Sequence, residues 1–284
     1  HCAVQYGIDA FCGADMRYAL CIEYDGSAFC GWQSQADGGA VQDAVEAALA
    51  IIADAPTRVV CAGRTDAGVH ALAQVVHFDT LANRPDSAWV RGVNSHLPSS
   101  VAVRWAQPVA DDFHARFSAR GRHYRYVLLN RPQRPGLQAG RVGWHHHLLD
   151  EGAMAQAAAM LLGEHDFSAF RSAECQAKSP VKELREVRIV RHGELIVFDF
   201  AASAFLHHMV RNIVGALVYV GKGAHPPEWL AELLASRDRR QAAPIFSASG
   251  LYFAGVDYDP GWQLNALQSV SRKVGAGDTV FFLP

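Results

Sequence analysis

The stretch CAGRTDAGVHALAQVVHFDT, residues 61–80, joins a glycine-bounded polar turn to a valine-rich segment. Two glycines, Gly63 and Gly68, enclose polar residues that include Asp66. Glycine and aspartate are both common in tight turns. We therefore expect strands over residues 57–62 and 72–79, with the turn as their connection. The turn alone leaves open whether Asp66 is a turn residue or a reactive carboxylate.

The elements around this stretch predict the order β-α-β-β-α-β for the first part of the chain. Apolar residues recur at helical spacing between Gly39 and Asp54, and alternate over the strand expected at 101–105. A capping residue after Pro85 begins a second helix. The remaining elements are a strand at 17–24 and the body of that second helix at 86–95.

The second part of the chain repeats the same order. A hairpin is expected over 185–202, turning at His192-Gly193, and an amphipathic helix over 206–217. The other expected elements are a strand at 122–130, a helix at 150–162, a short helix starting near Pro227 and a final strand at 251–258.

Two copies of this order predict an α+β protein made of two ferredoxin-like β-α-β-β-α-β halves. We expect the halves to join into one continuous, mostly antiparallel sheet, with helices on one side and an active-site cleft between the halves. The prediction rests on element order, because the two parts share no detectable sequence repeat. The expected boundaries are 1–16 for an upstream extension or cloning remnant, 17–115 and 116–260 for the halves, and 261–284 for a tail.

The composition is that of a soluble protein. Half of the 284 residues are hydrophobic, yet no apolar run approaches the roughly 18 residues that span a bilayer. The first residues lack the basic and apolar regions of a signal peptide. We therefore expect no membrane association and a cytoplasmic location. Six cysteines without metal-type spacing are expected to be reduced and mostly buried, at positions 2, 12, 21, 30, 61 and 175.

Charge is segregated along the chain. The net charge is −2, but residues 114–147 contain no acidic residue. Of the 26 basic residues, 22 are arginines, which suit bidentate phosphate contacts. We therefore expect a positive field that contacts nucleic-acid phosphates, from the seven arginines at 116, 120, 122, 125, 131, 134 and 141.

Three further residues are candidates for a site together with Asp66. Arg64 next to it favours an ionised carboxylate, as a nucleophile or base requires, and a simple turn needs no arginine there. On the strand at 122–130, Tyr124 shares a face with Tyr126, so it is either core or a stacking surface for a base. Arg211 flanks an apolar helix face, where it either extends to solvent or pairs with a carboxylate such as Asp66.

Other polar clusters give weaker signals. Adjacent histidines at 145–147 and 207–208 suggest a metal site, but neighbouring residues of a strand point to opposite faces, so we predict none. Asp111 and Asp112 resemble a solvated loop pair, and a glycosidase-like pair of carboxylates stays an alternative.

Taken together, the motifs carry a family resemblance. In order along the chain they are EYDGSAFCGWQSQ, CAGRTDAGVHALAQVVHFDT, DDFHARFSARGRHYRY, GEHDFSAF, AFLHHMVRNIVG and SGLYFAGVDY. This pattern, from about residue 17 to residue 258, resembles the tRNA pseudouridine synthase A (TruA) family. Departures are confined to the two ends of the chain and to Cys30, where the family usually has a larger or more polar residue.

The resemblance implies an isomerase without cofactor or metal that converts uridine to pseudouridine at positions 38 to 40 of the tRNA anticodon stem-loop. It implies Asp66 as the catalytic residue, Tyr124 as the residue that stacks on the base, and Arg211 as the partner of the aspartate. It also implies that Arg64 helps to flip the target base and that Leu251 lines the pocket. A homodimer that binds tRNA is implied as well.

Two rival interpretations stay open at this point. A tRNA-binding module without chemistry would use the arginines and Tyr124 but would not need Asp66. A metal-dependent hydrolase would use the histidines instead.

Overall fold

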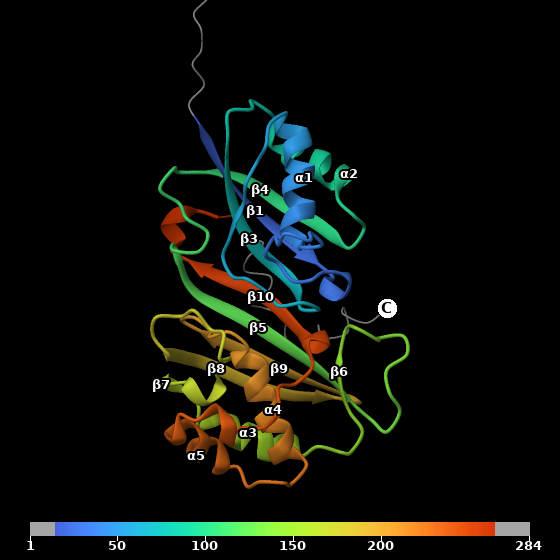
Figure 1. Ribbon diagram of the computed structural model, residues 1–284, viewed down its shortest axis with the longest axis vertical. Helices are drawn as coiled ribbons and strands as arrows, with labels where there is room; N and C mark the ends of the chain where they lie inside the picture. Colours follow the sequence, from blue (N-terminus) through green and yellow to red (C-terminus); the bar gives the residue numbers. More distant parts are fainter. Residues whose placement is uncertain (1–14, 265–284) are drawn as a thin grey trace, which may run out of the picture.

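The computed structural model describes residues 15–264, in which ten strands form one mostly antiparallel sheet (Figure 1). The spatial order is β4-β1-β3-β10-β5-β9-β8-β7, with β2 pairing with β3 and β6 with β5. The strands are β1 Met16–Tyr24, β2 Val60–Cys61, β3 His70–Thr80, β4 Val101–Val109, β5 Ala119–Asn130, β6 Gly143–His145, β7 Gly163–Asp166, β8 Val181–His192, β9 Leu195–Ala202 and β10 Leu251–Tyr258.

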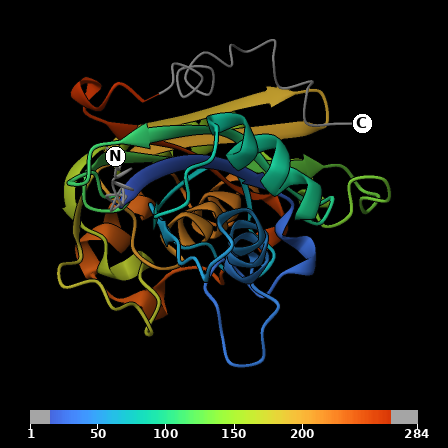
Figure 2. The same cartoon turned by 90° about the horizontal axis from the view of Figure 1, so that it is seen from above.

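The helices gather on one face of this sheet, below it in the view of Figure 2. The five α-helices of the described region are α1 Val41–Ala53, α2 Val93–His96, α3 Glu151–Ala159, α4 Met209–Gly221 and α5 Trp229–Ser236. A π-helical turn, Ala88–Gly92, leads into α2. Short 3-10 turns make up the rest, among them Ala248–Gly250 directly before β10.

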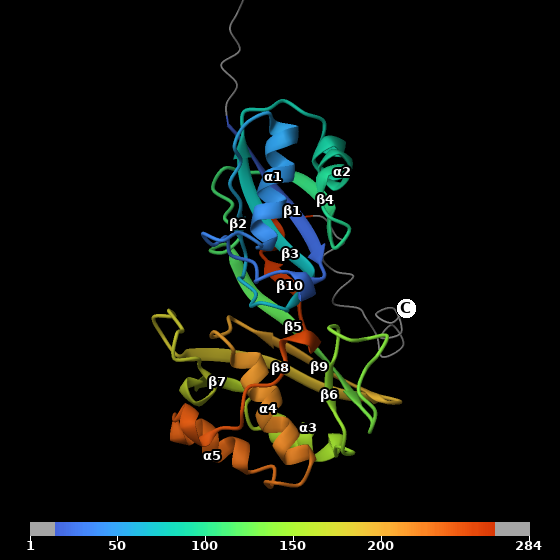
Figure 3. The ribbon, with the colours of Figure 1, turned by 45° about the vertical axis from the view of Figure 1, so that its right-hand side comes forward.

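Two groups of four strands within the sheet have the same internal order. In the first group the order is β4-β1-β3-β2, and in the second it is β10-β5-β9-β8, with every neighbouring pair antiparallel. The groups join through β3 and β10, which run parallel (Figure 3). The last strand in sequence therefore ties the two parts of the chain together.

One edge of β3 is shared between two partners. Its first residues, His70 and Ala71, pair with β10, whereas Val76 and His77 pair with β2. The loop from β2 to β3, which contains Asp66, therefore lies where the two strand groups meet. Strand pairing alone brings this turn to the centre of the molecule.

Two apolar cores stabilise the fold, one under each strand group. The first packs α1 and the π-helical turn against β1, β3 and β4, and includes the fully buried Trp32 and Trp89. The second packs α3, α4 and α5 against β5, β8 and β9, and includes the buried Phe198 and Phe200. Burial of such large apolar side chains supplies the main driving force for this arrangement.

Most of the predicted elements are present, and some of their bounds were wrong. The final strand spans the predicted residues 251–258, and the hairpin turns after His192 as expected. The strand predicted at 57–62 is only Val60–Cys61, because only these two residues form ladder pairs with β3. The helix predicted at 206–217 starts later, at Met209, because His208 before it adopts a left-handed conformation with a φ of 65°.

The continuous, mostly antiparallel sheet with helices on one side confirms the coarse prediction of fold class. Residues 1–14 and 265–284, which include most of the expected extension and tail, lie outside the described residues. Of the four cysteines described, Cys21 and Cys61 are buried but Cys30 is exposed and Cys175 half-buried, so burial was only partly predicted. Among residues 15–264, no helix has the length and apolar character to cross a membrane.

Candidate active site

Side chains from the N-terminal strand group hold the loop around Asp66 in place. The Tyr24 hydroxyl lies 2.7 Å from Thr65 Oγ1, and the buried Gln74 amide donates to the Gly63 carbonyl at 2.5 Å. The backbone N–H of Trp32 donates to the Thr65 carbonyl at 3.0 Å. Gly63 and Thr65, which precede Asp66, are therefore fixed by hydrogen bonds, and this part of the turn has little freedom.

Two glycines let another part of the chain approach this loop closely. A Cβ at Gly26 would overlap the Val69 carbonyl, and one at Gly31 would come within 2.8 Å of the Thr65 carbonyl oxygen. Gly31 also has a φ of 103°, which side chains strongly disfavour. The segment after β1 thus packs against the Asp66 loop backbone to backbone.

Three nitrogen atoms from one distant segment surround the Asp66 carboxylate. His207 Nε2 lies 3.0 Å from Oδ1, while His208 Nε2 and Arg211 Nη1 lie 3.2 and 3.3 Å from Oδ2. The Asp66 side chain is 23% exposed, so it is held in place but still open to a ligand. Of the residues that the sequence predicted for the site, Arg211 therefore contacts Asp66, although the two are 145 residues apart in the chain.

The start of α4 explains how these three side chains converge. His208 precedes the helix in a left-handed conformation, and Arg211 follows three residues later, one helical turn along. Arg211 is anchored at a second point, because its Nε donates to the Phe246 carbonyl at 2.9 Å. Burial lowers the pKa of His208; the Asp66 carboxylate opposes this effect, and the charges of His207 and Arg211 add to it.

The sequence interpretation of the paired histidines was wrong. His207 and His208 lie in a turn before α4 rather than on a strand, and their rings face each other with centroids 3.9 Å apart. Both reach the same carboxylate, so the argument that they point in opposite directions does not hold. The sequence did contain a signal that these histidines lie near Arg211. They precede it by three and four residues, and residues at this spacing share a helix face.

This cluster has the composition of a small metal site. The ligand atoms of Asp66, His207 and His208 lie within 4.8 Å of one another, and carboxylate and imidazole groups are common metal ligands. The Arg211 guanidinium on the same carboxylate opposes a second positive charge there. The arrangement therefore favours a positioned carboxylate over a bound cation.

Tyr124 lies on β5 next to this cluster. Its ring makes edge contacts with Phe205 and Phe253, at centroid distances of 4.9 and 5.1 Å. Burial raises the pKa of the Tyr124 phenol far above its ordinary value, and the Asp66 carboxylate raises it further. Tyr124 therefore keeps its proton, so it can donate a hydrogen bond but is a poor base.

The other two predicted residues lie in different surroundings. Arg64 is exposed and forms no ion pair or side-chain hydrogen bond within the described part of the chain. Leu251 opens β10 and is only 5% exposed, packed in the second core opposite Tyr126. The structure thus leaves Arg64 open to a ligand and places Leu251 in the interior.

Most of the seven arginines between 114 and 147 serve the fold, contrary to the expectation of a free phosphate-binding track. Arg125 is buried against Asp199 at 2.7 Å, and Arg122 donates to three backbone carbonyls. Three others form ion pairs, namely Arg120 with Asp259, Arg131 with Glu194 and Arg141 with Asp25. The long-range acidic partners were not visible in the local sequence.

Arg116 and Arg134 differ from the other five arginines. Both are exposed, and neither side chain forms an ion pair or hydrogen bond to a residue of the described range 15–264. Asp111 and Asp112 are also exposed, as expected of a solvated loop pair, and Arg17 donates to the Asp111 carbonyl.

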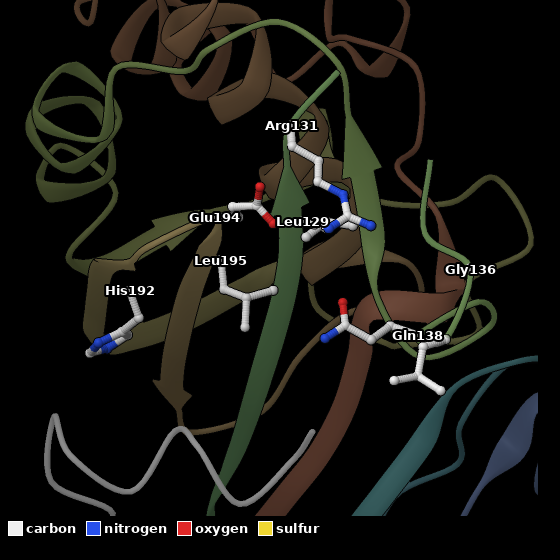
Figure 4. A pocket seen from close by; sticks show the side chains of 8 residues that line it. Leu129, Arg131, Gly136, Gln138, His192, Glu194 and Leu195 are labelled. Carbon is white, nitrogen blue, oxygen red and sulfur yellow. Dashed lines mark hydrogen bonds and ion pairs between the residues drawn. The ribbon is translucent and has the colours of Figure 1, made fainter. Parts of the chain in front are cut away.

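A surface hollow of about 340 Å³ includes Arg131, one of the seven predicted phosphate-contacting arginines, in its lining (Figure 4). Its lining comes from the end of β5, the loop after it and the hairpin between β8 and β9, including Leu129, Arg131 and Glu194. None of the predicted site residues lines it. The cleft expected between the two halves stays a prediction.

Comparisons with known proteins agree with these features. The family model described as tRNA pseudouridine synthase matches residues 20–118 and 157–259, which include Asp66, His207 and Arg211. The tRNA pseudouridine synthase A of Dechloromonas aromatica is 66% identical over 249 residues, which cover 88% of this chain and 95% of that protein.

Other relatives have the same name. That of Aromatoleum aromaticum is 66% identical over 249 residues, covering 88% of this chain and 94% of its own length. That of Thiobacillus denitrificans is 61% identical over 243 residues, covering 86% and 94%. With a family model that matches most of the chain and relatives at this identity, the chain belongs to the tRNA pseudouridine synthase family.

Proposed function

We propose that this protein is an isomerase that converts uridine to pseudouridine in tRNA. The observation that carries the proposal is the Asp66 carboxylate, held by His207, His208 and Arg211 at the junction of the two strand groups. The reaction breaks the bond between the base and C1′ and forms a bond from C1′ to C5 of the same base. It needs no redox partner, so a positioned carboxylate and a confined base suffice, and we propose no cofactor.

Asp66 supplies the reactive group in this proposal. It acts as a nucleophile on the sugar or the base, or as a base toward a sugar proton. Arg211 stabilises the negative charge of the carboxylate at 3.3 Å, and its bond to the Phe246 carbonyl keeps the guanidinium in position. Fixing a reactive group before the substrate arrives is a main source of enzymatic rate enhancement.

Tyr124 contributes a protonated phenol beside the carboxylate. The edge contacts with Phe205 and Phe253 fix the plane of its ring. We propose that the target uracil stacks on this ring or receives its hydrogen bond, while Leu251 supports the apolar wall behind it. Because burial and the Asp66 charge keep the phenol protonated, Tyr124 acts as a donor rather than as a base.

The substrate uridine has to leave its helix to reach Asp66. Base extrusion costs a few kcal/mol, and a cation that enters the vacated space offsets part of it. Arg64 is exposed two residues before Asp66, which suits this role. We propose positions 38 to 40 of the anticodon arm as the targets, with Arg116 and Arg134 as contacts to phosphates.

The finer architecture supports the same proposal. The shared order of β4-β1-β3-β2 and β10-β5-β9-β8 leads us to infer two ferredoxin-like halves, 17–115 and 116–260, with the reaction at the cleft between them. We also propose a homodimer that binds tRNA in the cytoplasm. Light scattering of the purified protein, with and without tRNA, measures the stoichiometry.

Incubation of an unmodified tRNA transcript with the protein, followed by mapping of pseudouridine, tests the function. We expect product at positions 38 to 40 and undiminished activity in EDTA. Tight binding without any product would instead identify an RNA-binding module. Loss of activity on chelation, restored by a divalent metal, would identify a metal-dependent enzyme.

A further inference from the structure

Phe117 is an aromatic side chain that the fold leaves in water. It is 77% exposed, whereas Trp144, the next aromatic among the exposed apolar residues of 15–264, is 37% exposed. Exposure of this much apolar area to water is unfavourable. Single exposed apolar residues are nevertheless common on protein surfaces, so exposure alone does not indicate a binding site. The surroundings of Phe117 distinguish it from an incidental surface residue.

The turn that presents Phe117 is held rigidly by side chains from other elements. His77 Nδ1 accepts the backbone N–H of Ala115 at 3.0 Å, and the Tyr258 hydroxyl donates to the Ala115 carbonyl at 2.5 Å. Arg122 Nη2 donates to the Arg116 carbonyl at 2.8 Å. Three side-chain contacts, two of them long-range, therefore fix the two residues before Phe117, and binding a ligand would cost little entropy for ordering them.

One face of the Phe117 ring is already covered by an aromatic partner. The His114 ring stacks on it with centroids 4.2 Å apart and an interplanar angle of 29°. His114 Nδ1 accepts the backbone N–H groups of Arg116 and Phe117, both at 3.2 Å. Burial and the nearby Arg17 charge lower the pKa of His114, so the ring is neutral at pH 7. The stack is preformed, and most of the Phe117 side chain stays exposed.

A cation lies over the exposed Phe117 ring. The Arg116 guanidinium carbon is 5.8 Å from the Phe117 ring centroid, and its side chain has no acidic partner within residues 15–264. An aromatic ring next to an unpaired arginine is the combination that binds a nucleobase together with its phosphate.

The turn also adjoins the Asp66 loop. Arg122 Nη2 donates both to the Arg116 carbonyl and to the Ala62 carbonyl, so one nitrogen bridges the two loops. Burial raises the pKa of the Cys61 thiol to about 12, and the charges of both Arg64 and Arg116 oppose this effect. Arg116 and Arg64 therefore both lie near Cys61, which precedes the Asp66 loop.

We propose that His114, Arg116 and Phe117 form a stacking platform for an unpaired nucleobase of the RNA substrate. An unpaired base near the extruded uridine stacks on the exposed part of the Phe117 ring, while Arg116, which lies over that ring, turns to the adjoining phosphate. The platform thus holds RNA beside Asp66 without reading sequence. This inference rests on the proposed function, which identifies RNA as the ligand. It assigns a second contact point for that RNA, besides the site around Asp66.

Phe117→Ala tests the platform, with Phe117→Trp and Leu148→Ala as matched variants. Leu148 is 81% exposed but lies before α3, so Leu148→Ala removes a similar exposed apolar group elsewhere. Binding of unmodified tRNA is followed by fluorescence anisotropy at several salt concentrations, and pseudouridine formation is measured in parallel. We expect roughly 5- to 150-fold weaker binding and a correspondingly higher KM for Phe117→Ala, with Phe117→Trp close to wild type.

Salt separates stacking from charge contacts. The salt dependence of binding should keep its slope in Phe117→Ala, whereas Arg116→Gln should reduce the slope by about one. Wild-type affinity of Phe117→Ala, or an equal loss in Leu148→Ala, would overturn the platform. A change of oligomeric state by light scattering in Phe117→Ala would show that a second copy of the chain covers Phe117 instead. If wild-type protein binds tRNA but forms no pseudouridine, the proposed function fails while the platform can still be measured.

Discussion

The sharpest test of the active-site proposal is Asp66→Asn. The carboxylate offers two oxygens to three nitrogen atoms, with His207 on Oδ1 and both His208 and Arg211 on Oδ2. An asparagine keeps the shape but has one oxygen. If that oxygen takes the Oδ2 position, the amide nitrogen faces His207 Nε2. His207 can then accept a hydrogen bond by moving its proton to Nδ1. The folded arrangement is therefore retained.

The expected stability cost of this substitution is small. The contact to Arg211 changes from an ion pair to a hydrogen bond between the charged guanidinium and a neutral oxygen, and both lie within the range of about 1.5–3 kcal/mol for hydrogen bonds of charged groups. The free energy of unfolding should therefore fall by about 1 kcal/mol, which lowers Tm by roughly 2–4 °C for a chain of this size.

The expected loss of activity is far larger. Removal of a general base reduces the rate by roughly 10²–10⁴-fold, and removal of a nucleophile by on the order of 10⁶-fold. The size of the loss therefore bears on which role Asp66 has. The assay is release of tritium from C5 of labelled uridine in tRNA, because the new bond to C5 displaces that hydrogen.

Asp199→Asn is the matched control. Asp199 is 21% exposed and is held by Arg125 and Arg188 at 2.7 and 2.9 Å, which resembles the surroundings of Asp66. We expect a similar change in Tm and a rate near that of wild type. Product at the wild-type rate from Asp66→Asn would refute the assignment, as would an equal loss of rate in Asp199→Asn.

Two further predictions concern the scaffold around the site. Gly26→Ala should lower the free energy of unfolding by about 3 kcal/mol, because the added Cβ overlaps the Val69 carbonyl. Gly38→Ala, with a φ of 70° and open space around it, should cost only about 1 kcal/mol; equal urea midpoints for the two variants would contradict this steric argument. Burial and the charges of Arg17 and His114 lower the pKa of His77 from 6.5 to about 4. The unfolded chain therefore binds a proton first, and stability should fall as the pH drops from 6.5 toward 4. The loss of stability with falling pH should be smaller in His77→Gln than in the wild-type protein, as measured by urea unfolding across that pH range. An identical pH dependence in both proteins would contradict the assignment to His77.

Local sequence determined the order of the elements and the position of the Asp66 turn. The strand at 251–258 and the hairpin turn after His192 have the predicted bounds, because alternation and glycine turns act over a few residues. The same reasoning placed Asp66 between two strands, though it made the first of them too long. That the turn lies at the junction of two strand groups follows from the pairing of β3 with β10, which sequence periodicity does not report.

Tertiary structure alone decided which polar groups meet. Arg125 and Arg141 appeared free in an acid-poor segment, yet each pairs with an aspartate more than 70 residues away. His207 and His208 appeared to diverge, yet a left-handed residue before α4 turns both toward Asp66. Coulomb and hydrogen-bond energies depend on distances of a few ångströms, and those distances are set by sheet pairing and helix packing. A local pattern therefore identifies a reactive carboxylate, and only the folded chain supplies its partners.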